Sequence, residues 1–286
     1  MERIKIAQSY DPKWLEVNRP QPLVDNRIEK LIQDVIQGNI TQDVSDQVYA
    51  DFKTECEAWI RASRLNSLLG FEEFTRIDIC IGCTQFIDNI YMKGPVQFLN
   101  GDYRYHERLQ IGSKVDGTDT LIPNVPLIIA MPFPSTGDVH KDMSFILDKC
   151  IEKNIPVHID AAWITCSKEI EFDFRHPAIK SFAISLSKGL GLGWNRIGLR
   201  WTKESENDAI SIMNDFNMNN RALAIIGLHF IRNLPPDYLW KTHADHYFKI
   251  CDDFGLVPTN SIYLALKDGQ PVGVSPLIRY LENAST

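Results

Sequence analysis

The sequence predicts an α/β fold in which a mostly parallel central sheet is flanked by helices, with a smaller α+β domain built from both chain ends. Short apolar runs alternate with helical segments through the middle of the chain, and both ends are mainly helical. No internal repeat or low-complexity linker interrupts them. We therefore expect an arm and helices of the small domain in residues 1–65, the large domain in 66–205 and the remaining small domain in 206–286.

The first part of the chain has the pattern of an extended arm followed by two helices. Residues 8–22 are rich in proline and polar side chains, which disfavours regular structure. Residues 26–37 place apolar side chains three and four positions apart, the spacing of a helix with one apolar face. A second helix is expected to begin near Thr41, a favourable N-cap residue, with Asp43 and Asp46 in its first turn.

Six short apolar runs predict the strands of the sheet. They lie at residues 77–81, 96–99, 127–131, 157–159, 182–184 and 197–201. Their apolar side chains are consecutive rather than alternating, which is typical of strands covered on both faces in a parallel sheet. Between two of these runs, residues 141–154 have a helical pattern and predict a βαβ unit.

After about residue 203 the pattern is mainly helical again. Helices are expected at residues 209–216, 221–231 and 239–254. Residues 261–266, followed by Asp268 and Gly269, predict a small β element with a tight turn. A last helix is expected to begin near Ser275.

Composition argues against several classes of protein. A chain of 286 residues with 44% hydrophobic content can bury a substantial core. A net charge of −7 without any run of Lys and Arg argues against a nucleic-acid surface. Because no signal peptide or membrane span is recognisable, we expect no membrane partner and a cytoplasmic location. The lone C-x-x-C at Cys80 and Cys83 predicts reduced, buried thiols rather than a metal site.

Residues 185–198 carry the most chemical information. Lys188 follows an apolar run, lies next to the hydroxyls of Ser185 and Ser187, and precedes glycines that let a ligand approach the backbone. Its amine is a candidate nucleophile. Arg196 follows eight residues later, and a guanidinium binds phosphate through two parallel donors. The lysine precedes the glycines, so the segment is not a P-loop. Taken alone, a surface lysine in a glycine-rich turn would give the same pattern.

This segment resembles the fold type I enzymes that use pyridoxal 5′-phosphate (PLP), the aspartate aminotransferase superfamily. In that family a serine stands three residues before the lysine and an arginine eight residues after it, as Ser185 and Arg196 do here. The resemblance implies the PLP-dependent transferase fold and a Schiff base between Lys188 and PLP. It also implies that Ser185, Ser187 and Arg196 bind the cofactor phosphate.

Asp160 is the next residue to which the resemblance gives a role. It ends an apolar run and is followed by two alanines and Trp163. Considered alone, an aspartate at a strand end is more often a helix cap or a solvated turn residue. In the family, an aspartate at this place pairs with the protonated pyridine nitrogen of PLP. Trp163 stands where the family usually has a tyrosine that donates to the cofactor's phenolic oxygen, and it can donate only through its indole N–H.

Two further segments resemble parts of the family's cofactor site. Residues 81–85 lead through glycine into a helix, where Cys83 and Thr84 are the expected donors to the phosphate, although a turn without a ligand has the same pattern. Among residues 101–105, Tyr103 rather than Tyr105 is expected to stack on the pyridine ring. A tyrosine of the protein core would give the same pattern there.

Other correspondences are altered or weaker. Residues 131–137 resemble the family's asparagine-proline-threonine-glycine loop, but the asparagine is missing, and Phe133, Pro134 or Ser135 stands in its neighbourhood. Near the C-terminal end, Arg279 could clamp a substrate carboxylate, or it could simply interact with a helix dipole or with solvent.

The matches occur in the family's chain order over about residues 80–200. They imply a PLP-dependent aminotransferase that acts on an amino acid or another small amine as a homodimer. A PLP-dependent lyase or decarboxylase on the same site, and a non-catalytic PLP-fold protein, remain alternatives. The residues do not identify the amino donor, the acceptor or the pathway. Trp14, Leu15 and Leu23 are candidates for the dimer interface or for packing within the chain.

Overall fold

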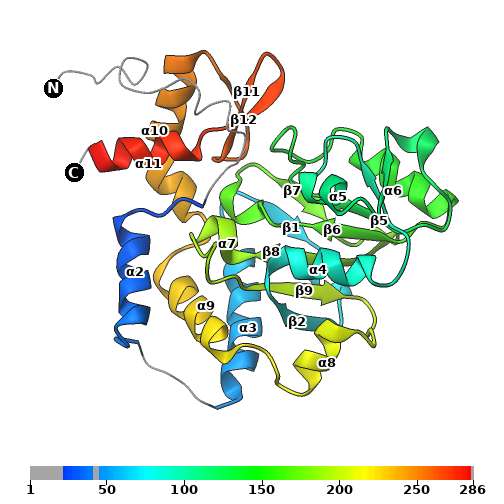
Figure 1. The fold of residues 1–286 in the computed structure, drawn as a ribbon, viewed down its shortest axis with the longest axis horizontal. Helices are drawn as coiled ribbons and strands as arrows, with labels where there is room; N and C mark the ends of the chain where they lie inside the picture. Colours follow the sequence, from blue (N-terminus) through cyan, green and yellow to red (C-terminus); the bar gives the residue numbers. More distant parts are fainter. Residues whose placement is uncertain (1–21, 41–44, 285–286) are drawn as a thin grey trace.

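The computed structural model describes residues 22–40 and 45–284. Within them, a seven-stranded sheet lies at the centre and helices pack around it (Figure 1). The last part of the chain, orange to red in Figure 1, forms a smaller unit of two helices and short strands at one side of the sheet. No helix in the described ranges is long and apolar enough to cross a membrane.

The central sheet is mostly parallel. Its spatial order is β2 (Arg76–Cys80), β9 (Gly198–Thr202), β8 (Ile179–Ser185), β6 (Val157–Asp160), β5 (Leu127–Ala130), β3 (Gln97–Leu99) and β4 (Ser113–Val115). Strands β4, β3, β5, β6 and β8 are parallel to their neighbours, and β9 is antiparallel to both β8 and β2. The predicted α/β fold with a mostly parallel sheet is confirmed.

Both faces of the sheet are covered, as the consecutive apolar runs predict. On one face, Ala183 of β8 packs with helix α4 (Gly82–Tyr91). On the other face, Phe182 of β8 belongs to the main core, where its ring stacks on Trp201 of β9 at a centroid distance of 4.7 Å. Neighbouring residues of one strand point to opposite faces, so a run with no polar position is what this double burial requires.

Other helices cover the sheet or belong to the C-terminal unit, which contains α10 and α11 (Figure 1). Helix α3 (Gln47–Arg61) packs against α9 (Arg221–Asn233) and contacts β2, and α8 (Ala209–Asp215) also contacts β2. The rest are α2 (Asn26–Ile36), α5 (Arg104–Leu109), α6 (Met143–Glu152), α7 (Leu186–Gly189), α10 (Tyr238–Phe254) and α11 (Ser275–Ala284).

The predicted C-terminal β element is present. Strands β10 (Val257–Pro258), β11 (Leu264–Lys267) and β12 (Gln270–Gly273) form an antiparallel sheet. Asp268 and Gly269 have φ values of 52° and 74° between β11 and β12. Two successive positive φ angles are those of the tight hairpin turn that an Asp-Gly pair favours.

Contacts between distant segments join the N-terminal helix to the C-terminal unit. Asp25, which caps α2, accepts hydrogen bonds from the Tyr238 hydroxyl at 2.8 Å and from His243 Nε2 at 3.0 Å. Both partners belong to α10. The division of the chain at residues 65 and 205 stays a prediction.

The structure differs from the sequence prediction in several elements. Helix α3 begins at Gln47 with Asp46 at its N-cap position, so the prediction of Asp46 inside the first turn is wrong. Thr41 and Asp43 lie outside the described residues, as do Trp14, Leu15 and most of the predicted arm. A parallel pair, β1 (Ser67–Leu69) with β7 (Glu171–Asp173), was not predicted, because three-residue strands with exposed positions carry no apolar run.

The strand directions place several loops at one edge of the sheet. Because β5, β6 and β8 are parallel, their carboxyl ends meet at the same edge, and β2 also ends there. In open α/β sheets this edge is where ligands usually bind. The segments that follow these four strands carry most of the residues singled out from the sequence.

Candidate active site

Gly82, Ser185, Ser187 and Arg196 come together where β2 and β8 end. A Cβ atom added at Gly82 would lie 3.1 Å from Ser185 Oγ and 3.6 Å from Ser187 Oγ. It would also lie 3.5 Å from the Arg196 Nη2 atom. Gly82 has a φ of 66°, a conformation that glycine adopts without strain. The three polar groups therefore surround a space that is open because residue 82 has no side chain.

Local structure explains the position of the two serines. Ser185 ends β8 and caps α7, and its Oγ accepts a hydrogen bond from the Ser187 N–H at 3.1 Å. The same hydroxyl donates to Ser187 Oγ at 2.9 Å. Serine is a preferred N-cap residue because its hydroxyl binds the unpaired N–H groups of the first turn. The cap holds both hydroxyls at the opening beside Gly82.

The Arg196 guanidinium completes this group. Its Nη2 donates to Thr84 Oγ1 at 2.5 Å. Its buried Nε has no hydrogen-bond partner among the residues that the structure describes. A guanidinium with an unused donor beside two hydroxyls fits a phosphate, which offers several acceptor oxygens. We call Gly82, Thr84, Ser185, Ser187 and Arg196 the anion cluster.

Helix α4 begins at this cluster. It starts at Gly82, so Cys83 and Thr84 lie in its first turn, where backbone N–H groups have no partner within the helix. The Cys83 thiol points elsewhere, because it donates to the Ala183 carbonyl at 3.3 Å. If Cys83 contributes to anion binding, it therefore does so through its backbone, while Thr84 contributes through its contact with Arg196.

Asp160 lies beside the anion cluster at the end of β6. Its side chain is only 5% exposed, and its Oδ1 accepts a hydrogen bond from the Ala162 N–H at 3.0 Å. Burial raises the pKa of Asp160, whereas the nearby Cys83 side chain, the Ala162 N–H and the charge of Arg196 lower it. A buried carboxylate of this kind would be stabilised by a cation placed against it. A protonated pyridine nitrogen fits that requirement.

Lys188 lies in α7, between the anion cluster and the C-terminal unit. Burial lowers the pKa of its amine, as does the nearby Arg196 charge, while Cys166 raises it. The Tyr263 hydroxyl donates to the Lys188 carbonyl oxygen and accepts a hydrogen bond from the Leu23 N–H at 2.9 Å. Tyr263, which directly precedes β11, thus links the turn that carries Lys188 to the segment before α2. Leu23 itself is buried within the chain.

The structure distinguishes the two candidate tyrosines. Partial burial and the Asp160 carboxylate raise the pKa of Tyr103, while Arg196 lowers it, so its hydroxyl is within electrostatic reach of both. The ring of Tyr103 remains 42% exposed and stacks on Tyr105 with centroids 5.8 Å apart. Tyr105 instead donates its hydroxyl to Asp88 at 2.6 Å. Tyr103 is therefore the tyrosine with a partly open face near Asp160.

The altered loop after β5 lies against the turn that carries Tyr103. The peptide bond between Met131 and Pro132 is cis, and Phe133 is buried. A Cβ atom added at Gly101 would lie 3.3 Å from Ser135 Oγ. Of the three residues near the missing asparagine, Ser135 thus places its side chain closest to the turn before Tyr103.

Trp163 and Arg279 are less directly joined to this group. Trp163 caps the short helix η4 (Ile164–Cys166), is half-buried and accepts hydrogen bonds at its carbonyl from Cys166 and Ser167. No contact in the described residues fixes its indole N–H toward Asp160. Arg279 is exposed on α11 and lowers the pKa of Tyr263, so it lies within electrostatic reach of the residue that contacts Lys188.

Two residues of this region were missed in the sequence. Asp102 is buried next to Tyr103, and its pKa is raised to about 7, mainly by burial. Its position directly before the selected tyrosine was the available signal. Tyr263 contacts Lys188 across a separation of 75 residues, and nothing local in the sequence indicates that contact.

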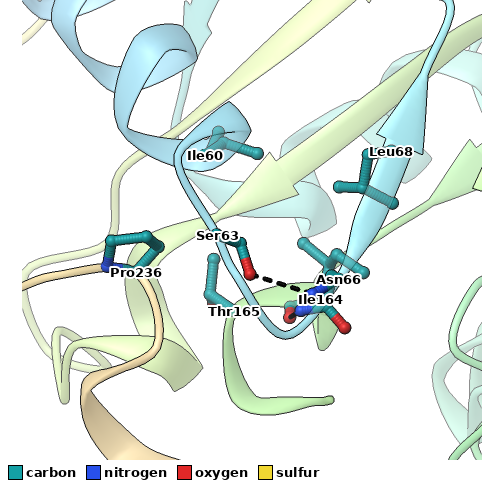
Figure 2. A pocket seen from close by; sticks show the side chains of 7 residues that line it. All are labelled: Ile60, Ser63, Asn66, Leu68, Ile164, Thr165 and Pro236. Carbon is teal, nitrogen blue, oxygen red and sulfur yellow. Dashed lines mark hydrogen bonds between the residues drawn. The ribbon is translucent and has the colours of Figure 1, made fainter. Parts of the chain in front are cut away.

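Figure 2 shows a small pocket that is separate from this group. It lies between the end of α3, the turn that follows it and η4, and none of its labelled residues is ionisable. Asn66 closes one side by donating to the Ile164 carbonyl at 3.4 Å (Figure 2). Thr165 separates the pocket from the lysine turn, because its side chain occupies the space beside Gly189. The pocket is therefore not part of the candidate active site.

The assembled residues include an anion cluster, a buried carboxylate and a lysine whose pKa is lowered. In the described ranges, no group of three or more His, Cys, Asp or Glu side chains could hold a metal ion. The arrangement can bind a phosphate at the anion cluster and face a cation at Asp160, and the Lys188 amine lies within electrostatic reach of Arg196. Their residues come from the ends of β2, β6 and β8 and, for Arg196, from the segment just before β9.

Comparison with known proteins gives a clear result only at the level of structure. No protein-family model and no curated protein sequence matches the chain. A tetra mutant of aspartate aminotransferase from Thermus thermophilus is similar, with a TM-score of 0.58 and 14% identity over 93% of this chain and 84% of that one.

Two further aminotransferases are similar. Histidinol-phosphate aminotransferase from Clostridium acetobutylicum has a TM-score of 0.56 and 12% identity over 93% of this chain and 98% of its own. Aromatic aminotransferase from Pyrococcus horikoshii OT3 has a TM-score of 0.61 and 15% identity over 87% of this chain and 78% of its own. The resemblance noted in the sequence is confirmed at the level of the fold: the chain has the same fold as these aminotransferases.

Proposed function

We propose that the protein is a PLP-dependent aminotransferase that acts on an amino acid or another small amine and holds PLP as a Schiff base on Lys188. The observation that carries the proposal is the convergence of three groups at one sheet edge. These groups are the anion cluster, the buried Asp160 carboxylate and the Lys188 amine. The aminotransferase fold of the chain supports it.

Each end of the site fits one part of PLP. The anion cluster would hold the phosphate, because it offers two hydroxyls and an unused guanidinium donor around an opening beside Gly82. Asp160 would face the pyridine nitrogen, and Tyr103 would cover one face of the ring. When bound, PLP supplies a ring that accepts electrons as a bond at the substrate's α-carbon breaks.

Lys188 has two tasks in this proposal. Its Nζ must attack a carbonyl carbon, which requires the neutral amine, and the lowered pKa increases the fraction in that form at neutral pH. With a substrate amine in the site, the same Nζ would be free to accept a proton from the substrate's α-carbon and to donate that proton back during the reaction. The Tyr263 contact to the lysine backbone keeps the turn in place while the side chain moves.

A lyase or decarboxylase on the same site is the second candidate, because the residues expected around the cofactor's phenolic oxygen differ from those of the resembled family. Trp163 and the loop at Pro134 and Ser135 replace the tyrosine and asparagine expected near the cofactor's phenolic oxygen. Different donors at that oxygen change how readily the protonated Schiff base loses its proton, and this affects the balance between reactions. The lining of the substrate pocket then selects the bond that breaks.

A product assay tests the proposed function. The purified protein with PLP is incubated with single amino acids and a 2-oxo acid acceptor, and both products are measured. An aminotransferase forms a new amino acid and a new 2-oxo acid in equal amounts. Release of carbon dioxide or of the side chain without transfer of the amino group would instead support the second candidate, a lyase or decarboxylase. A bound cofactor without turnover on any amine would contradict both.

Gly82→Ala should weaken PLP binding by roughly tenfold or more, because the new Cβ enters the space within the anion cluster. Gly255→Ala is the matched control: its φ is 62°, close to that of Gly82, but nothing lies within 4 Å of its Cβ. Both variants pay a similar backbone strain, so both should lose about 1 kcal/mol or more of stability. PLP titration measures the loss of affinity, and thermal melting measures the loss of stability. Equal PLP affinity in the two variants would refute the proposed role of Gly82 in the anion cluster.

We also propose that the active unit is a homodimer. Trp194 supports this, because it lies between Lys188 and Arg196 in the sequence and is 96% exposed in the single chain. An exposed tryptophan next to the site is suited to contact with a second subunit. An obligate interface would bury more than roughly 2,000 Å².

Sedimentation at micromolar concentration is therefore expected to show a dimer. Trp194→Ser should shift it toward monomer and lower the activity, whereas Phe145→Ser, which removes an exposed aromatic side chain on α6, should not. A wild-type protein that is monomeric at this concentration while it binds PLP and turns over would refute the homodimer.

A further inference from the structure

Asp102 joins its own turn to the end of β5 beside the candidate site. Its Oδ1 accepts a hydrogen bond from the Tyr103 N–H at 2.6 Å, and its Oδ2 accepts one from the Ala130 N–H at 3.1 Å. Ala130 is the last residue of β5 and pairs with Asp160 of β6. The carboxylate thus ties the turn that carries Tyr103 to the sheet at the level of Asp160. It is only 7% exposed, so water competes little for these two bonds.

The residue before Asp102 extends this contact to the loop after β5. Gly101 has a φ of 84°, and a Cβ atom added to it would lie 3.3 Å from Ser135 Oγ and 3.6 Å from Phe133 Cε1. The turn and the loop are therefore in close contact. Since Asp102 also holds Ala130, directly before that loop, one side chain fixes the relative position of Tyr103 and the loop.

The surroundings of Asp102 make this arrangement sensitive to charge. Burial raises the pKa of Asp102 to about 7, the two backbone N–H groups lower it, and the Asp160 carboxylate raises it. Tyr91 of α4 also faces it, since Asp102 contributes to the raised pKa of that tyrosine. An amide N–H can only donate, and the ionised carboxylate is the form that accepts well at both oxygens. Both bonds are therefore strongest above pH 7.

We propose that Asp102 is a positioning residue that holds Tyr103 and the 131–137 loop in the arrangement required around the PLP ring. This rests on the proposed function. Asp102 does not touch the reacting atoms: it acts through the Tyr103 backbone and through Ala130. When a pyridine cation lies against Asp160, the repulsion between the two carboxylates decreases, and Asp102 releases its proton more readily. Cofactor binding and tightening of the turn then favour each other.

Hydrogen exchange in the protein without PLP tests the structural part. Asp102→Asn keeps the shape of the side chain but turns an NH₂ group toward one of the two N–H donors. Exchange at Tyr103 and Ala130 should become roughly tenfold faster. Asp88→Asn is the matched control, because Asp88 binds the hydroxyl of the neighbouring Tyr105 and should leave these amides unchanged. In the wild type, protection of both amides, corrected for intrinsic rates, should fall as pH decreases through about 7.

PLP titration tests the functional part. Asp102→Asn should weaken PLP binding roughly tenfold at pH 8, and its difference from the wild type should become smaller at pH 6, where the wild-type carboxyl is protonated. Asp88→Asn should match the wild type at both pH values.

Each outcome bears on a different claim. Unchanged amide exchange in Asp102→Asn, or wild-type protection that does not vary with pH, would overturn the positioning role whether or not PLP binds. So would a wild type and an Asp102→Asn variant that bind PLP equally well at pH 8. A wild type that binds no PLP would instead refute the proposed function. If Asp102→Asn does not fold, the wild-type exchange profile alone decides the structural part.

Discussion

Lys188→Ala is expected to lower turnover by at least about a thousandfold, because it removes both the amine that holds the cofactor and the base that moves the substrate proton. The absorbance band of the Schiff base should be lost, even where PLP is still held through its phosphate by the proposed anion cluster. Absorbance spectra and steady-state rates measure the two effects.

The control for this variant is Lys203→Ala. Lys203 also has a pKa that is lowered by burial, but it follows β9 at the other edge of the sheet, where it donates to the His176 carbonyl. A lysine removed there should leave the absorbance and the rate unchanged. Lys188→Ala with the full absorbance of the wild type would show that PLP is held by another group.

Asp160→Asn is expected to lower turnover by roughly a hundredfold or more while PLP remains bound, because a neutral amide stabilises the pyridine cation far less than a carboxylate does. The amide oxygen can still accept the hydrogen bond from Ala162, so the end of β6 should keep its shape. Rates and PLP affinity, measured on the same samples, separate electronic effects from binding.

Although Asp160→Asn should lower turnover, it should not lower the stability of the protein without PLP. Burial raises the pKa of Asp160, so its ionised form costs stability as pH rises above the unfolded-state value. Near pH 7, Asp160→Asn removes that cost, and the melting temperature should stay equal or increase. A large loss of stability with unchanged turnover would show that Asp160 is a structural residue.

Much of the fold could be predicted because strands buried on both faces leave a distinct pattern. Residues 127–130 and 182–184 are apolar without interruption, and they lie in β5 and β8 of the central sheet. The order of the strands and the antiparallel direction of β9 depend on contacts between distant segments. Those contacts leave no local pattern, and the short β1–β7 pair has too few buried positions to be recognised.

In the candidate site, too, features within one segment could be predicted from the sequence, whereas contacts between distant segments could not. Ser185, Lys188 and Arg196 lie within one short segment, so their spacing could be recognised in the sequence. That Gly82 opens a space between them follows only from the pairing of β2 and β8 with β9. The double contact of Asp102 also needs β5 beside its turn, and a buried aspartate has no sequence signature that separates it from an exposed one.

Covalent mapping of the cofactor tests directly whether PLP is held on Lys188. The purified wild-type protein is saturated with PLP, reduced with borohydride, digested and analysed by mass spectrometry. We expect a phosphopyridoxyl group on one lysine, Lys188, and none in a sample reduced without PLP. A modification spread over surface lysines, or fixed at a lysine other than Lys188, would contradict the assignment of this site.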